Sequence, residues 1–193
     1  MKTYRKPKPL TYQQVERMAV SYLQRFPASI ERFREVMARK IKRYEARSET
    51  VVATALEWVA KAESFCLRVG LLDDKALAKG LVQSYHRRGD GLAAIRMKLI
   101  RKGIRSPELD EAVAMLTEKY ESTGTSVELV AAVRYLRRRR FGPFYDGELD
   151  WHTRRKQVAS LARRRLPADV CWTAIKLTRD EADAILYEAQ QNA

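Results

Sequence analysis

The chain has few cysteines and no long apolar run, and each shortage excludes a class of protein. Its two cysteines, Cys66 and Cys171, are far apart and lack flanking histidines, whereas a zinc site takes about four clustered ligands. No apolar stretch approaches the roughly 20 residues that span a bilayer, and no apolar stretch like that of a signal peptide follows the basic segment 1–9. We therefore expect a cytoplasmic protein that uses no metal and no membrane, with both cysteines as small apolar residues on helices.

Residues for catalysis are also scarce. His86 and His152 stand alone, without a candidate nucleophile and orienting acid, and no Gly-x-x-x-x-Gly-Lys loop supports ATP hydrolysis. A metal-dependent nuclease needs converging carboxylates, and Asp146, Glu148 and Asp150 are the best enzymatic alternative. A surface turn explains these three acids more simply, so we predict no enzymatic activity and no cofactor.

Positive charge is abundant. The sequence has 38 Lys and Arg against 24 Asp and Glu, a formal net charge of +14. Such an excess indicates a polyanionic partner, either nucleic acid or an acidic protein surface. The acids gather in 106–128 and in the C-terminal helix. We therefore predict a basic concave surface and an acidic convex one.

Glycine and proline lie at boundaries, and between them apolar residues recur at helical spacing without convincing strand alternation. This pattern predicts an all-helical fold of about ten helices. Helix starts are marked by Ser106, by Ser126 and by a capping box of Thr178 with Glu181. The predicted helices cover about residues 12–26, 29–47, 49–69, 73–88, 91–102, 106–121, 126–140, 150–165, 168–177 and 178 onward.

A weak internal repeat surrounds the turn 88–91. Shifts of 62 residues backward and 76 forward align apolar positions with apolar positions, although any amphipathic helical hairpin aligns to some extent. The aligned sets are Val82, Tyr85, Ile95 and Leu99; Val20, Leu23, Phe33 and Met37; and Val158, Leu161, Cys171 and Ile175. About three units of three helices each, stacked into an elongated and curved molecule, would bury apolar faces that one unit leaves open.

This repeat gives the predicted domain organisation. Residues 1–10 form a flexible basic N-terminus, and 11–70 and 71–121 form the first two three-helix repeats. A connecting helix and loop occupy 122–149, and the third repeat occupies 150–193.

The central unit carries a set of short motifs in a fixed order. They are Gly70-Leu71-Leu72-Asp73-Asp74, then Arg88-Gly89-Asp90-Gly91, then Ile95-Arg96, and finally Lys102-Gly103-Ile104. In this order they resemble the central repeat of the RecX family. The third unit is similar but departs from the family, because Arg165 and Leu166 stand where the family usually has glycine and phenylalanine.

The resemblance implies three tandem three-helix repeats that bind RecA–DNA filaments. It also implies modulation, typically inhibition, of RecA's ATPase and strand exchange, with no catalytic residues. The expected partners are a RecA-type recombinase filament and single- or double-stranded DNA without sequence preference, bound by a monomer. An autonomous helix-turn-helix DNA-binding protein is the alternative, but no clear recognition helix carries Asn or Gln among its arginines.

Clusters of basic residues are the candidate contacts with RecA or DNA. The candidates are Arg87, Arg88, Lys98, Arg101, Lys102, Arg105, Arg134, Arg137, Arg138, Arg139, Arg140, Arg154, Arg155, Lys156, Arg163, Arg164 and Arg165.

Four further side chains receive separate predictions. Arg96 falls within an apolar stripe, so we expect it to be partly buried and paired with Asp73 or Asp74. Phe144 and Tyr145, in the loop 141–149, are the aromatic candidates for stacking on bases. Trp58 and Trp172 are expected in the core.

Overall fold

The computed structural model describes residues 10–48, 53–122 and 124–191, and in these ranges it has ten α-helices, one short 3-10 helix and no strand. The predicted all-helical fold is confirmed. Most of the predicted N-terminal segment 1–10 and the start of the predicted helix 49–69 lie outside the described residues. The chain forms two compact units, described separately below: residues 1–77 with 102–104, and residues 78–101 with 105–193. The elongated, curved stack of repeats stays a prediction.

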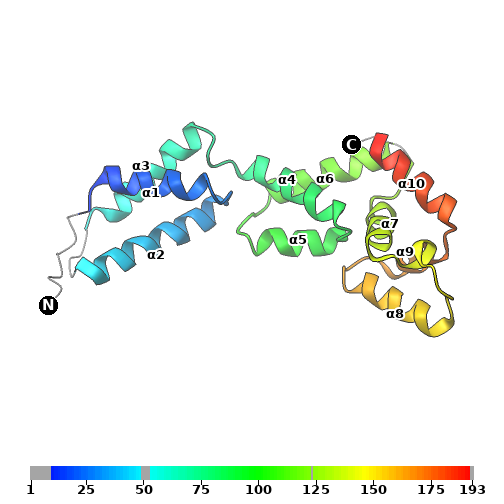
Figure 1. Cartoon of the computed structure of the whole chain (residues 1–193). Helices are drawn as coiled ribbons and strands as arrows, with labels where there is room; N and C mark the ends of the chain where they lie inside the picture. Colours follow the sequence, from blue (N-terminus) through cyan, green and yellow to red (C-terminus); the bar gives the residue numbers. More distant parts are fainter. Residues whose placement is uncertain (1–9, 49–52, 123, 192–193) are drawn as a thin grey trace, which may run out of the picture. The chain divides into compact units, whose positions relative to one another are not determined.

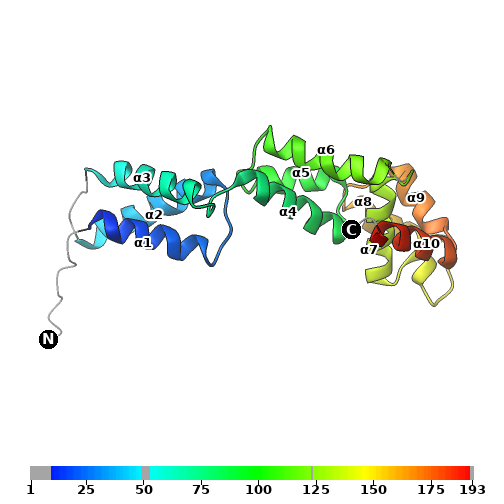
Figure 2. The same ribbon diagram turned by 90° about the horizontal axis from the view of Figure 1, so that it is seen from above.

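Unit 1 is built from three helices, α1 (Tyr12–Leu23), α2 (Ile30–Ser48) and α3 (Ala55–Arg68), which lie side by side in Figures 1 and 2. Helix α3 packs against both of the others. Each helix contributes fully buried side chains four residues apart, which is the spacing of one helix face. These are Val15 and Ala19, Phe33 and Met37, and Ala62 and Cys66. The predicted core role of Cys66 is confirmed.

Unit 2 contains most of α4 and all later helices. Their bounds are α4 (Asp74–Arg87), α5 (Leu92–Ile100), α6 (Glu108–Glu121), α7 (Val127–Arg139), the 3-10 helix η1 (Gly142–Phe144), α8 (Trp151–Ala162), α9 (Ala168–Lys176) and α10 (Arg179–Gln191). Helices α5 and α8 end before the predicted positions 102 and 165. Residues 101–102 and 163–165 therefore lie in turns.

Helix α7 is central to the core of unit 2. It packs against α6, α9, α10 and η1, and α8 packs against α9 (Figure 1). Ala131, Val133 and Leu136 on α7 are fully buried, together with Cys171 of α9. Sequence analysis treated this helix as a connector, but its apolar face also organises the helices that follow it.

Two predicted helix caps are confirmed and one is wrong. Ser126 Oγ accepts a hydrogen bond from the Leu129 amide (3.4 Å), and the capping box of Thr178 and Glu181 is formed. Ser106 does not cap α6, because Pro107 occupies the N-cap position. The Ser106 hydroxyl instead donates to the carboxylate of Asp110 (2.5 Å), which is a strong ionised acceptor.

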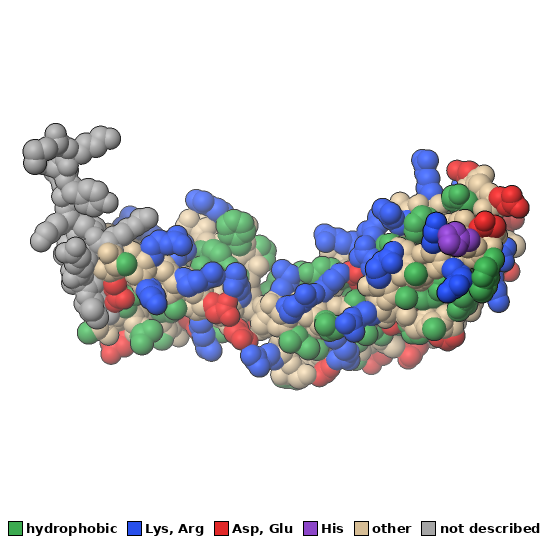
Figure 3. Space-filling model, turned by 90° about the horizontal axis from the view of Figure 1, so that it is seen from below, with side chains coloured by type: hydrophobic (Ala, Val, Ile, Leu, Met, Phe, Trp, Pro, Cys, Tyr) green, Lys and Arg blue, Asp and Glu red, His purple; other side chains and the backbone are tan. Residues whose placement is uncertain are grey.

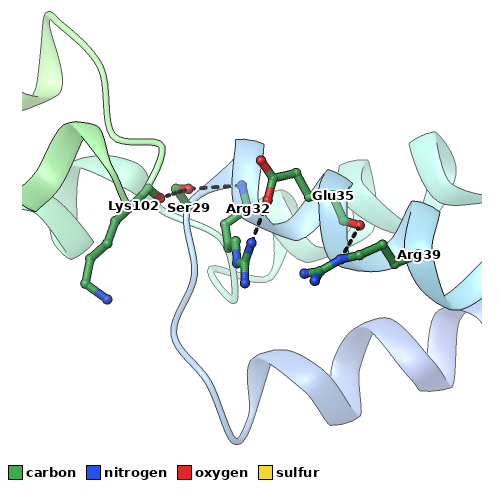
Figure 4. Close-up of polar contacts among 5 residues, drawn as sticks. All are labelled: Ser29, Arg32, Glu35, Arg39 and Lys102. Atoms are coloured by element: carbon green, nitrogen blue, oxygen red, sulfur yellow. Dashed lines mark hydrogen bonds and ion pairs between the residues drawn. The ribbon is translucent and has the colours of Figure 1, made fainter.

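A hydrogen-bonded joint holds the turn before α2 in unit 1. Ser29 is 1 % exposed; its hydroxyl donates to the carbonyl oxygen of Lys102 (2.6 Å) and accepts from the Arg32 amide (3.1 Å). Figure 4 shows this joint, with the Lys102 ammonium pointing away from it. The Ile30 amide, at the start of α2, donates to Asp74 Oδ1 (3.0 Å). A helix start that would otherwise lack partners is therefore satisfied by later parts of the chain.

The same joint occurs in unit 2, 62 residues later. The Gly91 amide donates to the carbonyl oxygen of Arg164 (3.0 Å), and the Leu92 amide donates to Glu128 Oε1 (3.0 Å). Ser29 with Lys102 and Gly91 with Arg164 are both separated by 73 positions. These contacts align α8 with α5.

Burial supports this alignment. Six pairs at the 62-residue shift are buried in both members: Ile95 and Gln157, Leu99 and Leu161, Ile104 and Leu166, Leu109 and Cys171, Ala112 and Ala174, and Val113 and Ile175. The 76-residue shift also pairs mostly buried residues, because the apolar face of any amphipathic helix recurs at the same spacing. The predicted third repeat at 150–193 stays a prediction, and the contacts favour a unit that begins at α7.

The two joints differ at one backbone position, and this difference yields a stability prediction. Gly103 has a φ of +77°, and Arg165, 62 residues later, keeps that left-handed conformation with a φ of +56°. We expect Arg165→Gly to raise the free energy of unfolding by about 0.5–1 kcal/mol, because the strain on an L-residue slightly exceeds the entropy cost of glycine. Gly103→Ala should lower it by about 2 kcal/mol, because a Cβ there would lie 2.8 Å from Ser29 Oγ. Urea denaturation measures both changes, and a destabilised Arg165→Gly protein would contradict the assignment.

Candidate polyanion-binding surface

The predicted contact residues divide into an exposed set and a set engaged in the fold. Lys98, Arg134 and Arg164 are partly buried and bonded to neighbouring side chains. The exposed set is Arg87, Arg88, Arg101, Lys102, Arg105, Arg137, Arg138, Arg139, Arg140, Arg154, Arg155, Lys156, Arg163 and Arg165. All of these except Lys102 belong to unit 2. The exposed set is the part that a polyanion can reach.

Four arginines line one hollow of about 410 Å³ on unit 2, which we call the arginine groove. Arg87 comes from the end of α4, and Arg134, Arg137 and Arg138 share one face of α7 because they are three and four positions apart. Leu186 and Gln190 of α10 complete the lining, so the described lining residues include no carboxylate. Each guanidinium can donate paired hydrogen bonds to a phosphate or carboxylate.

A buried histidine holds one of these arginines in place. His86 Nε2 lies 2.8 Å from the carbonyl oxygen of Val127, which can only accept, so Nε2 carries the proton. Nδ1 is then an acceptor for Arg134 Nη1, at 3.0 Å. The guanidinium also lies over the ring of Tyr120, 5.9 Å from its centroid. Arg134 is therefore fixed before any anion arrives, which reduces the entropy lost on binding.

His86 gives a pH prediction. Burial lowers its pKa from 6.5 to about 4. Between these values the unfolded chain binds more protons than the folded one, so stability is complete above pH 6.5 and is lost as the pH falls to 4. We expect this residue to account for a loss of about 3 kcal/mol in unfolding free energy. His86→Gln should remove that pH dependence in denaturant titrations; an unchanged slope would show that another group titrates.

Asp90 explains why two predicted contact residues are not free. This aspartate is almost fully buried, and its carboxylate accepts from Lys98 Nζ (2.5 Å) and from Arg164 Nη1 (2.8 Å). The two cations neutralise a charge that would otherwise be costly to bury. The predicted binding role of Lys98 and Arg164 stays untested, but the structure gives both a place in the fold.

The turn around Asp90 is shaped by close backbone approach. A Cβ at Gly89 would lie 2.5 Å from the Cβ of Tyr135, and one at Gly91 would lie 2.7 Å from the carbonyl oxygen of Arg165. The amides of Gly91 and Leu92, which could have met a phosphate at the start of α5, are already hydrogen-bonded within the chain. The two glycines therefore serve the packing of the turn.

The predicted partner of Arg96 is wrong. Its guanidinium pairs with Asp110 of α6, and its side chain is 41 % exposed. Asp73 Oδ1 instead accepts from the Ala76 amide (2.9 Å), and Asp74 accepts from the Ile30 amide. Both predicted partners are used as backbone acceptors, so Arg96 pairs with the neighbouring helix.

The remaining exposed cations extend the basic surface on both sides of the groove. Arg137–Arg140 end α7, where Arg138 and Arg139 lie over the rings of Tyr135 and Phe141 at 5.5 Å from each centroid. Helix α8 carries Arg154, Arg155 and Lys156 and contains no acidic residue. In Figure 3, Lys and Arg side chains cover much of the face drawn for unit 2, and acidic side chains gather at its margin. This one-sided charge is suited to a polyanion.

The aromatic side chains are not where the sequence placed them. Phe144 is buried against the core, so it is not available to stack on a base, whereas Tyr145 is exposed. Trp58 packs against the edge of the unit 1 core. Trp172 is only partly buried and stacks on the exposed Trp151, a pair that sequence analysis missed because it assigned helical aromatics to cores.

The acids of the nuclease alternative have another structural role. Asp150 is the N-cap of α8 and accepts from the Thr153 amide (2.7 Å), while Asp146 and Glu148 are exposed. In the part of the chain that the structure describes, no three His, Cys, Asp or Glu side chains are grouped closely enough to hold a metal ion. Within the same residues, no helix has the length and apolar character needed to cross a bilayer.

Comparison with known proteins gives matches to one family. Residues 73–113 match the second three-helix domain of RecX. A protein of Agrobacterium fabrum named Regulatory protein RecX is 31 % identical over 128 residues, which are 66 % of this chain and 64 % of that protein. A protein of Myxococcus xanthus with the same name is 28 % identical over 161 residues, 82 % of each chain. No solved structure matches the chain.

The shared part is thus somewhat less than two thirds of the Agrobacterium protein. The family match coincides with α4, α5 and the start of α6, the segment that contains the Asp90 turn and the beginning of the arginine groove.

Proposed function

This chain belongs to the RecX family, and from that premise we propose that it binds RecA-type recombinase filaments on DNA and lowers their ATPase and strand-exchange activity. Its role is regulatory, as the name of its relatives says. The chain itself carries out no catalysis in this proposal and requires no cofactor.

The arginine groove is the observation that supports the proposal best. Four guanidinium groups surround one hollow, and one of them is positioned by His86 and Tyr120 before binding. A recombinase filament on DNA is a repetitive polyanion, either through its phosphates or through acidic side chains of its protomers. A basic surface would speed encounter with it and contribute affinity that falls with salt.

Regulation requires different affinities for two states of the filament. A ligand changes an equilibrium only by its differential affinity for the states involved. We propose that the bound chain favours a filament that is inactive in ATP turnover, either by locking the interfaces between protomers or by obstructing extension at an end. It acts as a monomer, in the cytoplasm, in recombination and DNA repair.

Binding measurements on filaments and on bare DNA test this function. Fluorescence anisotropy of the labelled chain would compare RecA filaments on single-stranded DNA, held with a non-hydrolysable ATP analogue, with the same DNA alone and with duplex DNA. We expect the filament to be bound most tightly. Preference for one duplex sequence without recombinase would instead support the helix-turn-helix alternative, and equal affinity for filament and bare DNA would overturn the proposal.

A further inference from the structure

Two tryptophans of unit 2 form a stacked pair at the surface. Trp151, the first residue of α8, is 65 % exposed, and Trp172 of α9 is partly buried beside the core residue Cys171. Their ring centroids are 5.8 Å apart and their planes differ by 12°, which is a parallel, offset stack. One indole is therefore anchored in the fold, and the other presents its apolar surface to solvent.

The position of Trp151 is defined by the local structure. Asp150 caps α8 through the Thr153 amide at 2.7 Å, which fixes the first helical turn. Helices α8 and α9 pack together, and that packing brings the two indoles into contact. A single exposed apolar side chain needs no explanation. An indole already held against a second indole, however, loses little freedom when a further ring stacks on it.

The charge around the pair identifies its ligand. The Arg155 guanidinium lies 5.8 Å from the centroid of the Trp151 ring, and Arg154 and Lys156 are exposed on the same helix. The sequence of α8 contains no acidic residue. A surface that combines aromatic rings with cations fits a ligand that combines flat rings with anions, which is the chemistry of a nucleic-acid strand.

We propose that Trp151, supported by Trp172 and Arg155, is a stacking platform for an unpaired base of single-stranded nucleic acid. The base must be unpaired, because a duplex buries the faces of its bases against one another. The flanking cations hold the backbone phosphates on either side, and stacking makes the contact tolerant of sequence. The inference extends the proposed function, on which its biological context rests, by assigning direct contact with a single strand.

Intrinsic fluorescence offers a direct test, because stacking of a base on Trp151 should quench its emission. The full chain would be titrated with a short poly(dT) strand and with an abasic strand of the same length, which has the same phosphates and no bases. We expect the wild-type chain to bind poly(dT) about 5- to 30-fold more tightly than the abasic strand. Trp151→Ala should bind both strands alike, and Trp151→Phe should lie between.

Trp58→Phe is the matched control, since it removes a tryptophan of unit 1 and should leave both affinities unchanged. The platform is overturned if Trp151→Ala retains the wild-type preference for poly(dT), or if the wild-type chain binds the two strands equally. Inhibition of RecA by the wild-type chain, measured in parallel, separates the two proposals. RecA inhibition without a preference for bases removes the platform alone, whereas a base preference without RecA inhibition removes the regulatory function alone.

Discussion

Replacing Arg87, Arg137 and Arg138 with glutamine is expected to weaken binding to RecA–DNA filaments by about 30- to 100-fold at low salt. These three side chains are exposed and line the arginine groove, so glutamine removes their charge without leaving a buried cavity. The dependence of affinity on salt should change as well. Each lost phosphate contact reduces the slope of log K against log salt by about 0.7 to 0.9. Anisotropy titrations at several salt concentrations measure both quantities.

The matched control removes the same charge elsewhere. Arg17, Arg25 and Arg43 are exposed on α1, the turn after it and α2, and none belongs to the predicted contact set. Their replacement by glutamine lowers the net charge by the same amount but should reduce affinity no more than a few-fold. If the two triple variants lose affinity equally, only the net charge matters and the groove has no special role.

The largest effect on stability is expected at Asp90. Asp90→Ala leaves Lys98 and Arg164 without their shared carboxylate, and it separates the turn at Gly91 from the turn at Arg164. Removing one partner of a fully buried ion pair costs about 3–5 kcal/mol. Here the cations are 29 % and 31 % exposed and can regain water, so we expect a loss of about 2–3 kcal/mol. Urea or thermal unfolding would measure it.

Asp110 provides the comparison for Asp90. It also accepts a hydrogen bond from an arginine, Arg96, but its side chain is 51 % exposed. Exposed pairs contribute about 0–1 kcal/mol, so Asp110→Ala should cost less than 1 kcal/mol. Equal losses for the two variants would mean that burial of Asp90 is not what makes its ion pairs important.

Much of the fold could be predicted from the sequence because it depends on local signals. The apolar spacing in Val15 and Ala19, the cap at Ser126 and the capping box at Thr178 each act within one or two helical turns. The family resemblance likewise rested on contiguous motifs, which fall within the matched segment 73–113. Helix ends were the weaker part, because terminal turns fray and depend on tertiary contacts.

The contacts between distant residues could not be predicted. Nothing in the spacing shows that Asp90 would meet Arg164, 74 positions later, or that Asp110 would pair with Arg96 in place of Asp73 or Asp74. The sequence therefore identified the basic residues but not which of them are engaged in the fold. A signal for the Asp90 joint was present in the 62-residue shift, which also relates Gly103 to Arg165.

Aromatic exposure was the other point that spacing could not determine. Trp172 is adjacent to the buried Cys171 and looked like a core residue, yet it is partly exposed and supports Trp151. Phe144, in a loop-like segment, is buried because η1 packs against α7 and α9. Burial in both cases is decided by which helices meet, a property of the packed unit.

The ATPase rate of RecA on single-stranded DNA, measured with increasing amounts of this chain, tests the regulatory function most directly. We predict that the wild-type chain lowers the steady-state rate at concentrations well below that of RecA. The variant with glutamine at Arg87, Arg137 and Arg138 should require about 30- to 100-fold more protein for the same effect. A RecA ATPase rate that stays unchanged at saturating wild-type chain in modest salt would contradict the account.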